Sequence, residues 1–141
     1  MADDPAWSEG RVLALDFGAK RTGVAVSDPT GVVVRPLEIV PKANTSDGLR
    51  TISDLIIEHD VTHIVVGLPT GLGGDETKQT AQARSFAARL RQSVTIPVSL
   101  HDERFTSKLA DYTRAVTGSV ASRDSLAACH VLESWMEAQR T

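Results

Sequence analysis

Short apolar runs separated by turn residues fill the first third of the chain, a pattern typical of β-strands. The first run, residues 11–17, is apolar on both faces until it reaches Asp16, which predicts a central strand covered on both sides. Further strands are expected at about 22–27 and 32–39, and Pro41 is expected to end the third. The links between the runs are short, and one contains the turn sequence Asp-Pro-Thr-Gly. We therefore expect an antiparallel meander.

Beyond residue 45, helical patterns alternate with strand patterns. Two apolar runs, at about 62–67 and 94–100, predict further strands. Apolar residues at helical spacing predict four helices, which are one that Ser46 caps and three at about 75–92, 106–116 and 123–138. The order β-β-β-α-β-α-β-α-α predicts an α/β fold with a mixed five-stranded sheet, built from the meander plus βαβ units, and with helices on both faces.

The chain has 141 residues, a length that predicts one domain, here residues 11–141 after a loose tail at 1–10. The single cysteine, Cys129, excludes an internal disulfide and fits a reducing compartment. No apolar run is long enough to cross a membrane, and the first ten residues lack the apolar segment of a signal peptide. We therefore expect a cytoplasmic protein without a membrane partner.

The formal net charge of −3 argues against a protein that simply coats duplex nucleic acid, because such proteins carry a basic excess. It does not argue against an enzyme that holds a nucleic acid locally through bridging metal ions. Charge alone therefore leaves a nuclease among the candidates.

Carboxylates stand at the ends of two predicted strands. Asp16 closes the first strand, and Asp102 and Glu103 follow the last. If these strands lie parallel and adjacent, their carboxyl ends meet where open α/β sheets bind ligands. Asp124, at the start of the final helix, is a third candidate. Converging carboxylates repel one another unless a cation joins them.

Mg²⁺ and Mn²⁺ suit such a site, since both prefer oxygen ligands. Two such ions about 4 Å apart are a common device for phosphodiester hydrolysis. Each acid also has an ordinary interpretation: Asp124 is a common helix-start residue, and Asp102 and Glu103 could be a solvated strand end paired with Arg104. The combination of all of them favours a metal site with catalytic carboxylates.

Candidate substrate-binding residues lie in two places. Lys20 and Arg21 could neutralise a backbone phosphate, or could be exposed hairpin charge. In the glycine-rich loop, Gly73 and Gly74 could present backbone N–H groups to a phosphate at a helix start, or could form a flexible turn. The lone His101 and Cys129 are expected to be structural.

Four motifs together resemble the YqgF (RuvX) family. They are DFGAKRTGVAVSD, VVGLPTGLGGDE, HDERFTS and RDSLAACHVLESW, and they occur in the family's order over nearly the whole chain. The chain departs from the family in one respect: the link AVTGSVASRD, between the last two motifs, is short and only weakly basic.

The resemblance implies a ribonuclease H-like fold and a metal-dependent nuclease of the bacterial cytoplasm. Members are described as Holliday junction resolvases and as nucleases that process the 5′ end of pre-16S ribosomal RNA. Carried over by position, Asp16, Glu103 and Asp124 would be the metal ligands, with Asp102 as a further catalytic residue. Arg104, next to Glu103, is a further candidate for substrate binding.

The function expected first is an endonuclease that acts on structured RNA. Resolution of branched DNA is the alternative within the nucleases, and it requires a homodimer, because paired nicks need two symmetric sites. A catalytically silent RNA-binding or transcription-associated module is the alternative from another class. An actin-like phosphotransferase also begins with a strand and a DxG loop, but it needs two such domains.

Overall fold

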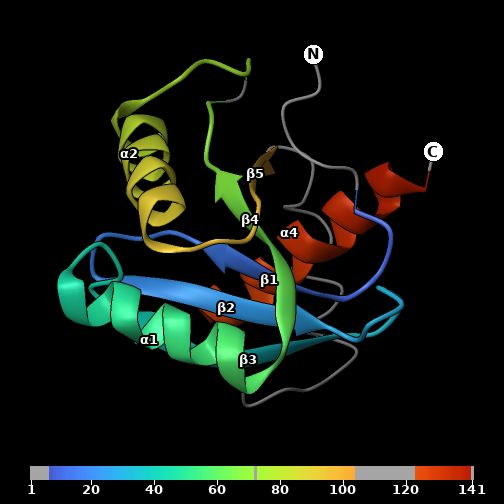
Figure 1. Cartoon of the computed structure of the whole chain (residues 1–141). Helices are drawn as coiled ribbons and strands as arrows, with labels where there is room; N and C mark the ends of the chain where they lie inside the picture. The colour runs from blue at the N-terminus through green and yellow to red at the C-terminus, as the bar shows by residue number, and fades with distance from the viewer. Residues whose placement is uncertain (1–6, 72, 104–122, 141) are drawn as a thin grey trace.

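The computed structural model describes residues 7–71, 73–103 and 123–140. A five-stranded sheet in the order β3-β2-β1-β4-β5 forms its centre, with helices on both faces (Figure 1). The strands are β1 (Arg11–Asp16), β2 (Arg21–Ser27), β3 (Val34–Pro41), β4 (Val61–Leu68) and β5 (Val98–Asp102). The helices are α1 (Ser46–Glu58), α2 (Lys78–Ser93) and α4 (Arg123–Gln139).

The sheet is mixed, as the sequence predicts. Strands β1, β2 and β3 pair antiparallel, while β4 pairs parallel with both β1 and β5. The expectation that the two acid-ended strands are direct neighbours is wrong, because β4 lies between β1 and β5. The crossover through α1 places β4 beside β1, and the crossover through α2 then adds β5 at the outer edge.

Alternation along the central strand sorts its side chains into two cores. Leu13 and Leu15 pack with residues of α1 and α2, including the fully buried Phe86. Val12 and Ala14 face the opposite way and pack with α4. Full burial of one such leucine contributes about 1.5–3 kcal/mol to the stability of the fold. Packing on both faces therefore fixes β1, and with it the position of Asp16.

Several element boundaries differ from the sequence prediction. Helix α2 begins at Lys78 and not at Asp75, because Thr77 and Thr80 form a reciprocal capping box. The cap of α1 is Thr45, whose hydroxyl accepts from the Gly48 N–H at 3.1 Å.

The last strand begins at Val98, four residues later than expected, since Val94 caps the end of α2. Strand β3 includes Pro41, which an edge strand tolerates. The helix expected at 106–116 and the link that follows it lie outside the described residues.

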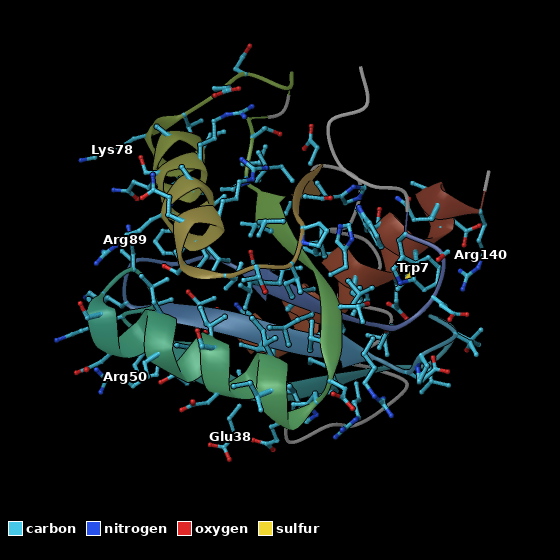
Figure 2. The ribbon with its side chains drawn as sticks, viewed as in Figure 1. Trp7, Glu38, Arg50, Lys78, Arg89 and Arg140 are labelled. Atoms are coloured by element: carbon cyan, nitrogen blue, oxygen red, sulfur yellow. The ribbon has the colours of Figure 1, made fainter. Side chains whose placement is uncertain are left out.

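Residues 7–10, expected in a loose tail, pack against the domain. The Trp7 ring lies edge-on to Trp135 of α4, with centroids 6.3 Å apart, and its indole N–H donates to the Gly10 carbonyl at 3.1 Å. Figure 2 shows Trp7 beside the C-terminal part of α4. Among the helices of the described residues, none is both long and apolar enough to cross a membrane.

Candidate active site

Asp16 ends the central strand between two glycines. Gly23 of β2 is its partner in the antiparallel register, and Gly67 of β4 follows the residue that pairs with Leu15. By alternation both glycines belong to the sheet face that Asp16 shares with Val12 and Ala14. The surface on either side of this carboxylate therefore lacks side chains, which leaves room for groups from more distant elements.

Glu103 uses the space above Gly67. A Cβ atom added to Gly67 would lie 2.7 Å from the Glu103 Oε2 and 2.8 Å from its Cγ, closer than van der Waals contact permits. The Glu103 side chain therefore crosses over β4, and its carboxyl group is hydrogen-bonded to that of Asp16. In this way the two acids meet although their strands are not neighbours.

The pair shares a proton at neutral pH. Burial, reinforced by the Asp16 charge and hydrogen bond and by the charge of Asp102, raises the pKa of Glu103 to about 9. Burial also raises the pKa of Asp16, against the hydrogen bond from Glu103 and together with the charge of Asp124. Two partly buried carboxyl groups in contact cannot both be ionised without a cation, so the pair keeps one proton.

Asp124 approaches from the other side of Asp16. The start of α4 lies directly on β2, where an added Cβ at Gly23 would overlap the Asp124 carbonyl group. Ser125 fixes this contact: its hydroxyl donates to the Leu37 carbonyl at 2.7 Å and accepts from the Val24 N–H at 3.3 Å. The Asp124 Oδ2 lies 3.4 Å from the Arg21 Nε.

The donor chemistry fits Mg²⁺ or Mn²⁺, because all three side chains offer carboxylate oxygens. Asp16 and Glu103 are in contact, and Asp124 is near enough for its charge to act on Asp16. Across residues 7–71, 73–103 and 123–140, no set of three His, Cys, Asp or Glu side chains is grouped closely enough to hold a metal ion. The structure thus brings two of the predicted ligands together, while the third is paired with Arg21.

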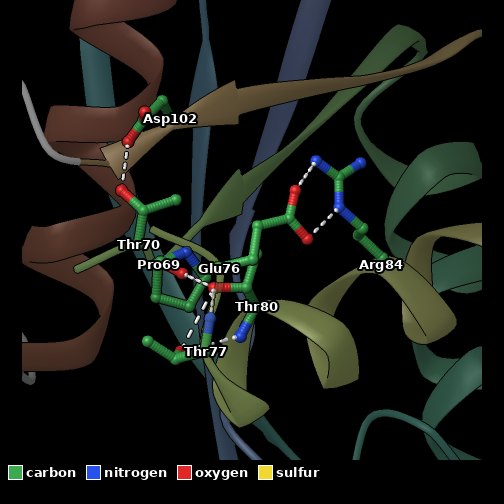
Figure 3. Close-up of polar contacts among 7 residues, drawn as sticks. All are labelled: Pro69, Thr70, Glu76, Thr77, Thr80, Arg84 and Asp102. Carbon is green, nitrogen blue, oxygen red and sulfur yellow. Dashed lines mark hydrogen bonds and ion pairs between the residues drawn. The ribbon is translucent and has the colours of Figure 1, made fainter. Parts of the chain in front are cut away.

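Asp102 is directed toward the loop after β4. Its Oδ1 accepts from the Thr70 hydroxyl at 2.9 Å, a contact drawn in Figure 3. This bond ties β5 to a loop that is itself tied to α2, since the Thr80 hydroxyl donates to the Pro69 carbonyl. Asp102 therefore holds the wall of the site in place.

Two backbone hydrogen bonds join described residues of the glycine-rich loop. The Gly71 N–H donates to the Asp75 carbonyl and the Gly74 N–H to the Gly71 carbonyl, both at 2.8 Å. Glu76 forms two hydrogen bonds, of 3.0 and 2.6 Å, with Arg84 of α2 (Figure 3). Because α2 starts at Lys78, the two glycines predicted to bind phosphate do not stand at a helix start. Their role stays a prediction.

The other predicted substrate contacts are exposed or outside the described residues. Lys20 and Arg21 are exposed in and after the turn between β1 and β2, and Arg21 is the partner of Asp124. Arg104 lies outside the described residues.

The acid pair opens into a cavity of about 270 Å³, called here the acid cavity. It lies between the β1–β2 turn, the loop after β4 and α2. Its lining residues are Asp16, Phe17, Gly18, Ala19, Pro69, Gln79, Gln82 and Glu103. The two glutamines were not among the predicted site residues, since a polar residue on an exposed helix face is ordinary in itself. The steric roles of Gly23 and Gly67 were also missed, although glycine inside a strand pattern often marks a close approach.

The surroundings of His101 and Cys129 indicate structural roles for both residues. The His101 Nε2 lies 2.7 Å from the Ser134 hydroxyl of α4. Cys129 of α4 is buried in the core, and burial, with a smaller contribution from the charge of Glu133, raises the pKa of its thiol to about 12. A thiol that holds its proton at neutral pH is a poor nucleophile.

Comparison with known proteins places the chain in a family. A family model described as "RuvX: Holliday junction resolvase" matches residues 10–138. The chain belongs to the RuvX family. This confirms the resemblance drawn from the four motifs.

Curated relatives cover nearly the whole chain. The RuvX-family relative from Koribacter versatilis is 38% identical over 139 residues, 95% of this chain and 91% of its own length. That from a Sulfurihydrogenibium species is 39% identical over 132 residues, with 90% of each chain covered. Both carry the name "Putative pre-16S rRNA nuclease".

Solved structures confirm the ribonuclease H-like fold for this RuvX-family chain. Thermus thermophilus RuvC, in complex with a Holliday junction substrate, superposes with a TM-score of 0.58 at 15% identity, covering 93% of this chain and 96% of that one. The yeast mitochondrial Holliday junction resolvase gives a TM-score of 0.58 at 13% identity, with coverage of 98% and 82%. At such identity the likeness concerns the fold.

The first prediction concerns the space above Gly67. Gly67→Ala places a methyl group where the Glu103 side chain lies, so the Glu103 carboxyl group should leave Asp16 for solvent. Carboxyl ¹³C NMR should then show Glu103 titrating well below its wild-type pKa of about 9. Gly71→Ala is the control, because its added Cβ would meet nothing closer than 3.6 Å. An unchanged Glu103 titration in Gly67→Ala would contradict this geometry.

The second prediction concerns stability in the presence of a chelator. The unfolded chain releases the Glu103 proton near pH 4.5, whereas the folded chain keeps it until about pH 9. Between these values the folded state binds more protons, so this group's contribution to stability falls as pH rises. Glu103→Gln removes that loss.

We compare the free energies of unfolding of Glu103→Gln and the wild type at pH 5 and at pH 9. The difference, variant minus wild type, should increase by at least about 1 kcal/mol from pH 5 to pH 9, which corresponds to roughly one pKa unit. Urea denaturation measures the difference. Glu137→Gln, at an exposed position of α4, should run parallel to the wild type. A Glu103→Gln curve that also ran parallel would disprove the buried proton.

Proposed function

We propose that this chain is a divalent-metal-dependent endonuclease that hydrolyses phosphodiester bonds in structured RNA, with the 5′ end of pre-16S ribosomal RNA as its substrate. The observation that carries the proposal is the partly buried Asp16–Glu103 pair, which opens into the acid cavity with the charge of Asp124 close by. Two carboxyl groups are rarely held in contact away from solvent unless they have a function, since burial disfavours their charged forms. The names of the curated relatives support the choice of RNA.

Asp16, Glu103 and Asp124 would together hold a pair of Mg²⁺ or Mn²⁺ ions. Such ions, when bound, supply an activated water and stabilise the leaving oxygen. The Asp16–Glu103 pair must release its shared proton to bind a cation. Hydrolysis forms a bond from the water oxygen to phosphorus and breaks the P–O3′ bond, which leaves a 3′-hydroxyl group on one product and a 5′-phosphate on the other.

Other residues have supporting roles in this proposal. Asp102 positions the loop that walls the acid cavity through Thr70. Lys20 and Arg21, both exposed beside the site, contact the phosphates that flank the scissile bond. Because Arg21 pairs with Asp124, a phosphate and this carboxylate compete for one guanidinium group.

Holliday junction resolution is the second candidate. The family model's description and the junction-bound structural neighbours favour it. Paired nicks at a junction require a symmetric dimer. A protein that stays monomeric in sedimentation at working concentration therefore favours RNA.

The third prediction tests catalysis. A metal-loaded preparation should cleave a pre-16S fragment, and Asp16→Asn should reduce the rate by at least about 100-fold, since removing one electrostatic contact at a reacting centre typically costs that much. Asp54→Asn, at an exposed position of α1, is the matched control and should cut like the wild type. A four-way DNA junction is assayed in parallel. The proposal is wrong if neither substrate is cut, or if Asp16→Asn cuts as fast as the wild type.

The fourth prediction tests metal binding without turnover. Mn²⁺ at about 100 times its dissociation constant should stabilise the wild type by about 2.7 kcal/mol, seen as a rise in melting temperature. Asp16→Asn and Glu103→Gln should show little of this rise, whereas Asp54→Asn should keep it. An equal rise in all four proteins would show that Mn²⁺ does not bind at these carboxylates. That result would favour the non-catalytic RNA-binding module.

A further inference from the structure

A second cavity, of about 370 Å³, lies beside the acid cavity. It is bounded by the β1–β2 turn, by Asn44 before α1, and by the first half of α2. Phe17, Ala19 and Gln82 line both cavities. A ligand whose reacting group lies at Asp16 and Glu103 can therefore extend directly into the second cavity. The volume of this cavity is within the usual range of about 300–1,000 Å³ for small-molecule sites.

The lining of the second cavity differs in kind from that of the acid cavity. No carboxylate lines it among the described residues, so it does not suit a metal ion. Phe17 supplies an aromatic surface, and the ring is held by stacking on the buried Phe86 with centroids 4.6 Å apart and an interplanar angle of 18°. The methyl groups of Ala19 and Ala81 add apolar contact. A flat, uncharged group fits this surface.

Polar groups at the rim can recognise the edge of such a flat group. Arg89 of α2 donates from Nη1 to the Asn44 carbonyl at 2.9 Å and to its Oδ1 at 3.1 Å. These bonds hold the Asn44 side chain at the cavity that it lines, where its NH₂ group is a potential donor to a ligand. The Gln82 amide and the Ser85 hydroxyl offer both donors and acceptors.

A cation lies next to these groups. Lys78, in the first turn of α2, lines the cavity and is exposed. Figure 2 shows Lys78 and Arg89 projecting from the same side of α2. An ammonium group at the edge of an apolar, amide-lined cavity suits a base that is attached to a phosphate.

We propose that the second cavity is a base subsite, which binds the nucleobase of the nucleotide next to the scissile phosphate. The inference rests on the proposed nuclease function and adds its substrate class, an unpaired nucleotide. A base within a duplex is stacked and cannot enter a side cavity, whereas an unpaired base can be splayed out, stacked on an aromatic ring and read along its edge. The Asn44, Gln82 and Ser85 side chains then give the cut a base preference.

Binding is tested first without metal and without turnover. Each of the four nucleoside 5′-monophosphates is titrated in a chelator against ¹⁵N-labelled protein. The backbone amides of Ala19, Ala81, Gln82 and Ser85 should shift at millimolar concentration, and one base should shift them most. Ala81→Trp fills the cavity and should abolish these shifts, while Ala88→Trp, at an exposed alanine of α2 outside the cavity, should keep them.

Cleavage gives the second arm. A substrate with an abasic nucleotide next to the cut should be cleaved at least about tenfold more slowly than the intact one by the wild type and by Ala88→Trp, since one stacked base contributes about 1–3 kcal/mol. Ala81→Trp should cut both substrates at the same slow rate.

The two proposals fail differently. Equal wild-type rates on intact and abasic substrates, or nucleotide shifts that persist in Ala81→Trp, would overturn the base subsite and leave the nuclease untouched. Absence of all cleavage would overturn the nuclease, and the metal-free titration would still decide whether a base binds.

Discussion

The contact between the Asp16 and Glu103 carboxyl groups is the constraint on which the rest of the site depends. It joins the first strand to the last across β4, and it exists because Gly67 has no side chain. Everything else is arranged around it. The two cores fix β1 from both faces, Ser125 fixes the start of α4 over Gly23, and Asp102 fixes the loop beside the cavity.

This contact opposes stability. Burying two carboxyl groups together is unfavourable at neutral pH, because one must keep a proton that water would take. The surrounding core offsets the cost, and a bound cation would remove it. A fold that keeps such a pair in place is preorganised for a positive ligand, since both carboxyl groups are already positioned and binding needs only the release of their shared proton.

The sequence predicted the elements and the residue types of the site better than their arrangement. The apolar run of β1 and its terminal Asp16 were evident, and so was the mixed sheet. The neighbour relation of β1 and β5 was wrong, because strand order depends on crossovers that local patterns do not encode. The start of α2 was placed too early, since Asp75 and Glu76 look like first-turn acids while the capping box of Thr77 and Thr80 decides the boundary. The link between Thr70 and Asp102 joins residues 32 positions apart, a contact that no spacing rule predicts.

The net charge of the protein favours recognition of nucleic acid through two adjoining cavities. A net charge of −3 argues against binding of nucleic acid through a broad basic surface. Positive charge lies beside the cavities instead, at Lys20 and Arg21 near the acids and at Lys78 by the second cavity. Contact with one phosphate group and one unpaired base needs only these few groups. Recognition would then depend on a local feature of the strand, which suits the proposed cleavage of one bond in a folded nucleic acid.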